Sequence, residues 1–254
     1  MNNAARADSG LFHAPRSDVF QNQGTFRTRF NFPGRNLPDR DDHGYGPLST
    51  VVESFMDPGT LIRMHQHRDE EIVSWVPAGV MRHDDREGNE LVTDSEHLLV
   101  MNAGAGFWHA EETLADDPPL RMLQIFVRPQ ETGLEPGIQH GPLPDPEPNA
   151  WRRVFAPAGS DHPFTVRNAV DCYDVRLDAD AGATLPEIEG RDAYVYVFEG
   201  DADVDGVALD ETESALWTGD GAPPTVTAGD EGATAVAFLI DPDAPVTRQG
   251  TIGR

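Results

Sequence analysis

Short runs of apolar residues, separated by glycine, proline, aspartate and asparagine, recur along almost the whole chain. No long segment with the 3.6-residue period of a helix lies between them. Short strands with frequent turns are typical of an antiparallel β-sandwich or β-barrel, so the pattern predicts an all-β fold. The strands expected in the first half cover residues 26–32, 48–55, 61–64, 72–76, 80–83, 91–93, 98–101 and 122–127.

A stretch rich in proline interrupts this pattern. Residues 129–149 hold six prolines and three glycines, a composition that suits a linker between two domains. Strand-like runs resume after it, at residues 164–166, 172–177, 194–198, 207–209, 215–217, 225–227 and 234–240.

The two halves of the chain resemble each other in rhythm. Residues 73–79 and residues 194–200 each form an apolar run that ends at a glycine. An internal duplication of a small barrel explains this similarity. We therefore predict two antiparallel barrels, and the expected boundaries are a loosely attached arm at 1–24, a first barrel at 25–129, a linker at 130–150 and a second barrel at 151–254.

The composition is strongly acidic. The chain has 44 Asp and Glu residues against 19 basic residues, all of them arginine, and a formal net charge of -25. Nucleic acids and anionic membranes would be repelled, so neither is an expected partner. Acidic excess without lysine is the composition of a protein from a high-salt organism, where salt screens self-repulsion. The alternative is a dedicated cation-binding surface.

The remaining composition bears on the cell compartment. The single cysteine, Cys172, cannot form an internal disulfide, and its alternating apolar surroundings predict a buried, unreactive thiol. No apolar run approaches the ~18 residues of a membrane span, and the N-terminal segment lacks the apolar core of a secretory signal. We expect a cytoplasmic protein without a membrane partner. The oligomeric state is left open.

Candidate metal ligands occur in two short segments of the first half. His65 and His67 are two residues apart, and so are His109 and Glu111. If both segments are strands, each pair points to one face, because side chains alternate with a period of two. Three imidazoles and a carboxylate suit a divalent first-row transition ion better than calcium or magnesium.

Two alternatives stand beside this interpretation. A His-x-His pair alone is also common on exposed strands, without a metal. Glu71 keeps the strand parity of His65 and His67 and could replace Glu111 as the fourth ligand. A ligating imidazole usually passes its other N–H to a carboxylate or carbonyl, which Glu71 or Asp69 could supply. No histidine follows His162, so the predicted site belongs to the first half.

The spacing of these residues resembles a known family. Gly59, His65, His67, Glu71 and Gly79 follow the first motif of the cupins, with one extra residue before the last glycine. Residues 104–109 are similar to the second motif, with glycine in the place usual for proline. The segments that resemble pirin-type, quercetinase-like bicupins more narrowly are 65–68, 83–89, 103–111 and 123–129.

This resemblance implies two β-barrels face to face, with one metal held in the N-terminal barrel. Carried over by motif, the metal ligands are His65, His67, His109 and Glu111, and Glu71 is outside the ligand set. The metal expected from the family is iron(II), and Mn, Ni, Co, Cu or Zn would also suit the donors.

The resemblance also implies functions. Some pirin-like bicupins open flavonols such as quercetin with molecular oxygen, so we expect a small aromatic or enol substrate, O2, and proton transfer at Glu111 or a neighbouring residue. Phe55, Met64, Trp75, Phe107 and Trp108 are the candidates for apolar walls, with ordinary barrel core as the alternative for each. The competing hypotheses are a non-enzymatic iron-binding redox sensor or transcriptional cofactor, and a cupin that isomerises a sugar or small acid.

Overall fold

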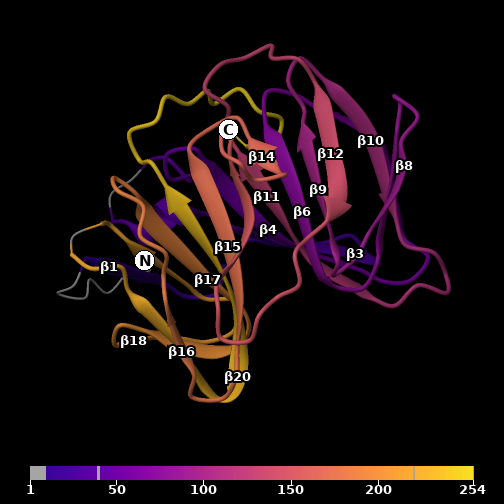
Figure 1. Ribbon diagram of the computed structural model, residues 1–254. Helices are drawn as coiled ribbons and strands as arrows, with labels where there is room; N and C mark the ends of the chain where they lie inside the picture. Colours follow the sequence, from indigo (N-terminus) through magenta and orange to yellow (C-terminus); the bar gives the residue numbers. More distant parts are fainter. Residues whose placement is uncertain (1–9, 39–40, 220, 254) are drawn as a thin grey trace.

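The computed structural model describes residues 10–38, 41–219 and 221–253. Within them the chain forms β-strands and one short 3-10 helix, η1 (Pro33–Asn36), which confirms the predicted all-β fold class. No helix in the described part of the chain is long and apolar enough to cross a membrane. The strands form two lobes, and the first half of the chain builds the upper right lobe of Figure 1.

Two antiparallel sheets build the first barrel. The larger has the strand order β12 (Gly137–Pro142), β9 (His97–Asn102), β6 (Glu71–Ala78), β11 (Leu120–Val127), β4 (Leu48–Met56), β3 (Phe26–Asn31) and β2 (Phe20–Asn22). The smaller has the order β5 (Leu61–His67), β10 (Phe107–Glu112), β7 (Met81–Asp85) and β8 (Glu90–Thr93). A buried apolar cluster holds residues of both sheets, among them Val52, Ile72, Met81, Phe107 and Phe126.

One nine-stranded sheet builds the second barrel. Its order is β1 (Leu11–Ala14), β19 (Ser214–Trp217), β17 (Asp192–Val204), β20 (Thr225–Ile240), β15 (Val170–Leu177), β13 (Arg152–Pro157) and β14 (Thr165–Val166). Two short strands extend it, β16 (Gly182–Thr184) beside β20 and β18 (Val207–Leu209) beside β17. The β13–β14 pair is parallel, whereas the other pairs of this sheet are antiparallel.

Two segments differ from their sequence-based descriptions. The arm expected to be loosely attached contains β1, which pairs with β19 of the second barrel because Leu11 and Phe12 are buried there. It also contains β2, which pairs with β3. The predicted linker contains β12, an edge strand of the first barrel, where proline is tolerated because one side of the strand needs no ladder partner. Residues 1–9 of the arm lie outside the described residues.

The two barrels share one apolar core. A single buried cluster contains Trp75 and Leu123 from the first barrel and Phe155, Tyr194 and Phe238 from the second. The shared core fixes the two barrels to each other, since separating them would expose this apolar surface to water. Cys172 belongs to the same cluster, where burial raises the pKa of its thiol, so the expectation of a buried thiol is confirmed.

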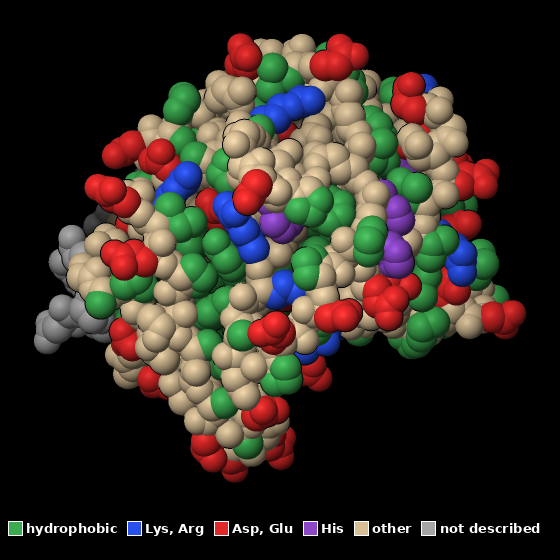
Figure 2. Space-filling model, in the orientation of Figure 1, with side chains coloured by type: hydrophobic (Ala, Val, Ile, Leu, Met, Phe, Trp, Pro, Cys, Tyr) green, Lys and Arg blue, Asp and Glu red, His purple; other side chains and the backbone are tan. Residues whose placement is uncertain are grey.

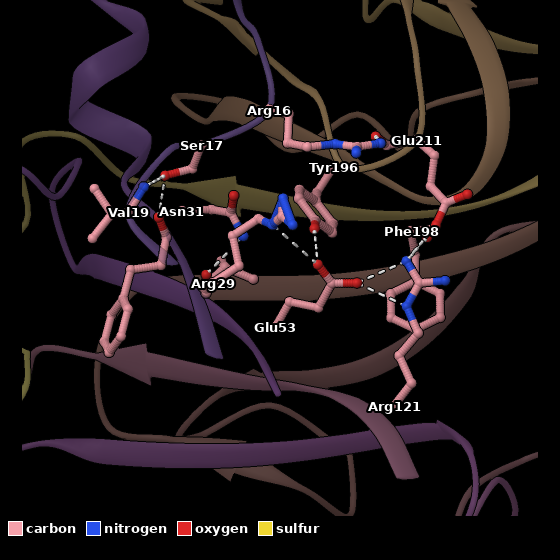
Figure 3. Close-up of polar contacts among 12 residues, drawn as sticks. Arg16, Ser17, Val19, Arg29, Asn31, Glu53, Arg121, Tyr196, Phe198 and Glu211 are labelled. Atoms are coloured by element: carbon pink, nitrogen blue, oxygen red, sulfur yellow. Dashed lines mark hydrogen bonds and ion pairs between the residues drawn. The ribbon is translucent and has the colours of Figure 1, made fainter. Parts of the chain in front are cut away.

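A buried carboxylate ties the two barrels together beside this core. Glu53 of β4 is fully buried, and it accepts hydrogen bonds from Arg121 Nε at 2.7 Å and from Tyr196 Oη of the second barrel at 3.2 Å. Arg29 Nε lies 3.8 Å from the same carboxylate (Figure 3). Arg121 also donates to the carbonyl oxygen of Phe198 at 2.6 Å, which links β11 to β17.

The acidic residues of the surface are dispersed. Figure 2 shows aspartate and glutamate side chains spread over both lobes of the visible face, with no single acidic patch. On this face, the distribution favours a general property of the surface over one dedicated cation-binding site.

Replacing Glu53 with alanine is expected to lower the free energy of unfolding by about 3 kcal/mol, because two guanidinium groups and a phenol lose a buried partner. Denaturant unfolding in molar salt measures the change. The matched control is Glu211→Ala, which removes the more exposed carboxylate that also pairs with Arg121. That control is expected to cost less than about 1 kcal/mol, and equal losses in the two variants would contradict the prediction.

Candidate metal centre

Strands β5 and β10 bring the three predicted histidines together. In their antiparallel register His109 lies opposite His65, and Phe107 lies opposite His67. Alternation then places the three imidazoles on one side of the sheet. The ring centroids are 4.4 Å apart for His65 and His109, 4.9 Å for His65 and His67, and 5.1 Å for His67 and His109.

The geometry of this cluster suits a single ion. One candidate ligand atom from each of the three histidines lies within 4.8 Å of the other two. His67 and His109 are buried, and His65 is half-buried. The sequence-based grouping of these three residues is therefore reproduced in the fold, and it forms a candidate metal site.

The contacts of two imidazoles fix which nitrogen is free. His65 Nδ1 lies 2.9 Å from the carbonyl oxygen of Arg63, and His67 Nδ1 lies 2.5 Å from Oε1 of Glu70. A carbonyl and a carboxylate can only accept, so Nδ1 carries the proton in both rings. Their Nε2 lone pairs are then available to an ion, and a metal-ligating histidine commonly has such a partner on its other nitrogen.

His109 provides the test of whether these residues fit a metal. It is 1 % exposed, and within the described residues neither of its ring nitrogens has a hydrogen-bond partner. Burial, followed by the neighbouring imidazoles of His65, His67 and His83, lowers the pKa of His109 to about 2. A buried neutral imidazole without a partner is costly, and a metal ion would engage one of its two nitrogens. The residues fit.

Glu111 lies beside His109. Its Oε1 is 3.7 Å from His109 Nδ1, and Gln124 Nε2 donates to both of its oxygens, at 2.8 and 2.9 Å. Burial raises the pKa of Glu111 to about 7, partly offset by His67 and by the Gln124 bond. Among the described residues, the group of ligand atoms within 4.8 Å contains the three histidines and not Glu111.

The alternative ligand, Glu71, is engaged elsewhere. Its Oε1 accepts from Asn102 Nδ2 at 2.6 Å, and its Oε2 accepts from the backbone N–H of Arg167 at 2.5 Å. Strand β5 ends at His67, and β6 begins at Glu71. The strand parity on which the Glu71 alternative rested therefore does not continue between them.

The residue that supports His67 is Glu70, and the expectation of Glu71 or Asp69 in this role is wrong. Asp69 has a φ of 49°, a left-handed conformation that turns the chain between the strands. Its carboxylate accepts from the backbone N–H of Gly133 at 2.7 Å, whereas Glu70 faces His67. Alternation cannot predict the direction of a side chain beyond such a turn.

An apolar cavity of about 190 Å³ adjoins the histidines. His65, His67, Glu111 and Gln124 line its polar part. Its apolar walls come from β3, β4, β5, β6, β11 and the C-terminal segment, and the residues are Phe26, Phe30, Val52, Ile62, Ile72, Phe126 and Ile252. Exposed Gln21 and Ile252, which is 42 % exposed, also border it, so the cavity reaches the surface.

The five aromatic and apolar residues expected as walls do not line this cavity. Trp75 lies in the shared core and donates its Nε1–H to Asp174 at 3.0 Å. Phe107 is core of the first barrel, and Trp108 lies beneath the guanidinium of Arg86 at 3.8 Å. In the sequence, the alternation of Phe26, Thr28 and Phe30 in β3 marks one face of the strand, and these residues line the cavity. Whether that face points into the barrel is decided by the pairing of β3 with β4, which the sequence of β3 alone does not show.

Strand β7 places a further pair of polar residues, His83 and Asp85, beside the histidine cluster, and the sequence analysis did not select them as site residues. His83 and Asp85 of β7 lie opposite Glu111 and His109 in the register of β7 and β10. His83 Nε2 is 3.1 Å from Asp85 Oδ2, and the His83 ring is 5.4 Å from that of His109. The i, i+2 spacing of His83 and Asp85 was the available signal.

Two family profiles match most of the chain. The Pirin family profile matches residues 10–127, and the profile described as quercetinase C-terminal cupin domain matches residues 153–236. A Pseudomonas aeruginosa protein provisionally named quercetin 2,3-dioxygenase is 30% identical over 71% of this chain and 78% of its own length. The quercetin 2,3-dioxygenase of Escherichia coli is 23% identical over 77% and 84%.

Solved structures agree on the fold. The bacterial pirin YhhW of Escherichia coli, crystallised in complex with nickel(II), superposes with a TM-score of 0.77 at 21% identity, covering 91% of this chain and 98% of that one. The two-barrel architecture, the histidine cluster in the first barrel and the sequence relatives lead to one conclusion. The chain belongs to the pirin family of bicupins.

Proposed function

We propose that the protein is a metal-dependent dioxygenase that acts on a small phenolic or enol substrate, with quercetin-like flavonols included in the class. The observation that carries the proposal is the cluster of three imidazoles beside an apolar cavity that reaches the surface. A catalytic metal site differs from a structural one in keeping a coordination position open to substrate. The names of the relatives support the same reaction class.

In this proposal His65, His67, His109 and Glu111 hold one ion. Glu111 is preferred to Glu71 because its carboxylate lies beside His109, whereas that of Glu71 is bound by Asn102 and Arg167. Iron(II) is the proposed metal because it is the ion that the family resemblance implies, and zinc is disfavoured because it has no redox chemistry to offer dioxygen. When bound, the ion would supply Lewis acidity towards a substrate hydroxyl and a redox partner for dioxygen.

Side chains of the protein bind the substrate ring and accept the proton of its hydroxyl group. Phe26, Phe30 and Phe126 offer apolar surface to a flat ring. Glu111, which is buried and accepts two hydrogen bonds from Gln124, accepts the proton of the substrate hydroxyl. In the proposed ring opening both atoms of O2 enter the product and carbon–carbon bonds of the substrate break, so the substrate itself supplies the four electrons and no external reductant is required.

The size of the cavity narrows the substrate class. Its volume of about 190 Å³ is below the ~300–1,000 Å³ of sites that enclose a drug-sized ligand. One aromatic or enol ring can therefore be enclosed, and the rest of a three-ring flavonol would extend past Ile252 towards solvent. We expect single-ring substrates to be accepted at least as well as quercetin.

Anaerobically purified protein is expected to bind about one divalent transition ion per chain. The variant with both His65→Ala and His109→Ala is expected to bind none, because two of the three clustered imidazoles are gone. Metal analysis, together with an anomalous map that locates the ion, measures this. His97→Ala is the control, since His97 is partly exposed and pairs with Asp94. Full metal content in the double variant would exclude this site.

Under air, in molar salt, the metal-loaded protein is expected to remove the absorbance band of quercetin or to consume a single-ring hydroxy-carbonyl compound. With labelled dioxygen the product should gain two labelled oxygen atoms. Glu111→Gln, with metal content measured in parallel, is expected to lower kcat by about 100-fold or more, because its amide cannot accept the proton. Glu112→Gln, on the opposite side of β10, is the matched control.

Tight metal binding with no oxygen consumption across phenolic and enol substrates would contradict the dioxygenase proposal. That outcome would instead support a metal-dependent redox sensor that acts through protein contacts.

A further inference from the structure

The last residues of the chain leave the second barrel and return to the first. After β20 the backbone N–H of Thr247 donates to the carbonyl oxygen of Pro129 at 2.9 Å, and Arg248 pairs with Asp42 at 2.9 Å. Figure 1 shows this yellow segment passing from the orange lobe across to the first barrel. Residues 250–253, called the C-terminal segment below, then lie against the turn that follows β5.

The C-terminal segment binds this turn through four hydrogen bonds. The N–H of Arg68 donates to Thr251 Oγ1 at 2.9 Å, and the N–H of Thr251 donates to the carbonyl oxygen of Arg68 at 3.3 Å. The N–H groups of Ile252 and Gly253 both donate to Oε2 of Glu70, at 2.8 and 2.7 Å. Two backbone donors on one carboxylate oxygen hold that carboxylate in a single orientation.

Glu70 transmits this constraint to His67. Its side chain is fully buried, so it depends on protein donors to compensate for the loss of water. Its other oxygen, Oε1, lies 2.5 Å from His67 Nδ1. The carboxylate therefore bridges the C-terminal segment and the imidazole, and it keeps the proton on Nδ1 and the lone pair on Nε2.

The packing around Glu70 is close. A Cβ added to Gly250 would lie 2.8 Å from Glu70 Oε2, and one added to Gly253 would lie 3.3 Å from it. The glycines thus let the backbone approach the carboxylate closely enough to donate to it. Between them, the side chain of Ile252 forms part of the cavity wall that also contains His65 and His67.

We propose that residues 250–253 are a working part of the metal centre: their N–H groups position His67 through Glu70, and Ile252 limits the cavity next to the ion. Glu70 is a positioning residue and does not itself bind the metal. The inference rests on the proposed function, because it takes His67 to be a ligand. It assigns to the second half of the chain, which carries no clustered histidines, a direct contribution to the site in the first barrel.

Four variants test the proposal in the full protein. A chain that ends at Gln249 removes both donors to Glu70. Glu70→Gln presents an amide to His67 Nδ1, and that amide either donates to Nδ1 and favours the wrong tautomer or turns its NH2 towards the two N–H donors. The two changes are then combined. Ile252→Ala keeps the backbone donors and removes only the wall. Glu87→Gln, in the exposed turn after β7, is the matched charge control.

The readout is the dissociation constant of nickel(II), measured by competition with a chelating dye, and it does not depend on activity. The shortened chain and Glu70→Gln are each expected to bind nickel(II) about 10- to 100-fold more weakly than the unchanged protein. The variant that combines both changes is expected to bind nickel(II) with a dissociation constant within about 3-fold of that of the weaker-binding single variant, because both changes act through one carboxylate. Ile252→Ala and Glu87→Gln are expected to stay within about 3-fold of the unchanged protein.

The outcomes separate this inference from the proposed function. Unchanged affinity in the shortened chain, or losses that multiply in the combined variant, would overturn the role of the C-terminal segment and leave the dioxygenase proposal standing. The expected pattern of affinities without oxygenation of any substrate would overturn the dioxygenase and leave the segment's role standing. An unchanged protein that binds no nickel(II) or iron(II) overturns both. An unchanged KM for quercetin in Ile252→Ala would overturn the role of Ile252 as a wall.

Discussion

The central constraint on this molecule is the burial of ionisable side chains inside an apolar barrel. A polar atom taken out of water costs free energy unless another group binds it. Around the candidate site most polar groups have a hydrogen-bond partner. Glu70 accepts from His67, and the carbonyl oxygen of Arg63 accepts from His65. Gln124 donates to Glu111. His109 departs from this rule, because both of its buried ring nitrogens lack a hydrogen-bond partner within the described residues. An ion bound by the three histidines would engage one of them.

The second barrel supports the candidate site of the first barrel. It shares a core with the first barrel, donates the Tyr196 hydroxyl to the buried Glu53, and supplies the N–H of Arg167 that engages Glu71. Engaging Glu71 keeps that carboxylate away from the histidines. The second barrel can therefore influence which carboxylate lies beside the histidines of the first.

Periodicity predicted which candidate residues share a face within a single strand. His65 and His67, and likewise His109 and Glu111, share a face because side chains alternate, and the family resemblance joined the two pairs. The same reasoning failed across the turn at Asp69, whose positive φ resets the alternation and brings Glu70 to His67. It also failed for the cavity walls, because the inward face of β3 is decided by its pairing with β4 and not by its own sequence.

The contribution of the C-terminal segment lay beyond local patterns for a different physical reason. Residues 250–253 have no strand or helix period. Their partner Glu70 lies 182 positions before Ile252 and 183 positions before Gly253 in the chain. A backbone N–H carries no information about side-chain identity, so no residue type in this segment marks it as a carboxylate donor. The only local signal is glycine at 250 and 253, which permits close approach without saying to what. A contact made by backbone donors to a distant buried acid can be found only once the fold has brought both ends together.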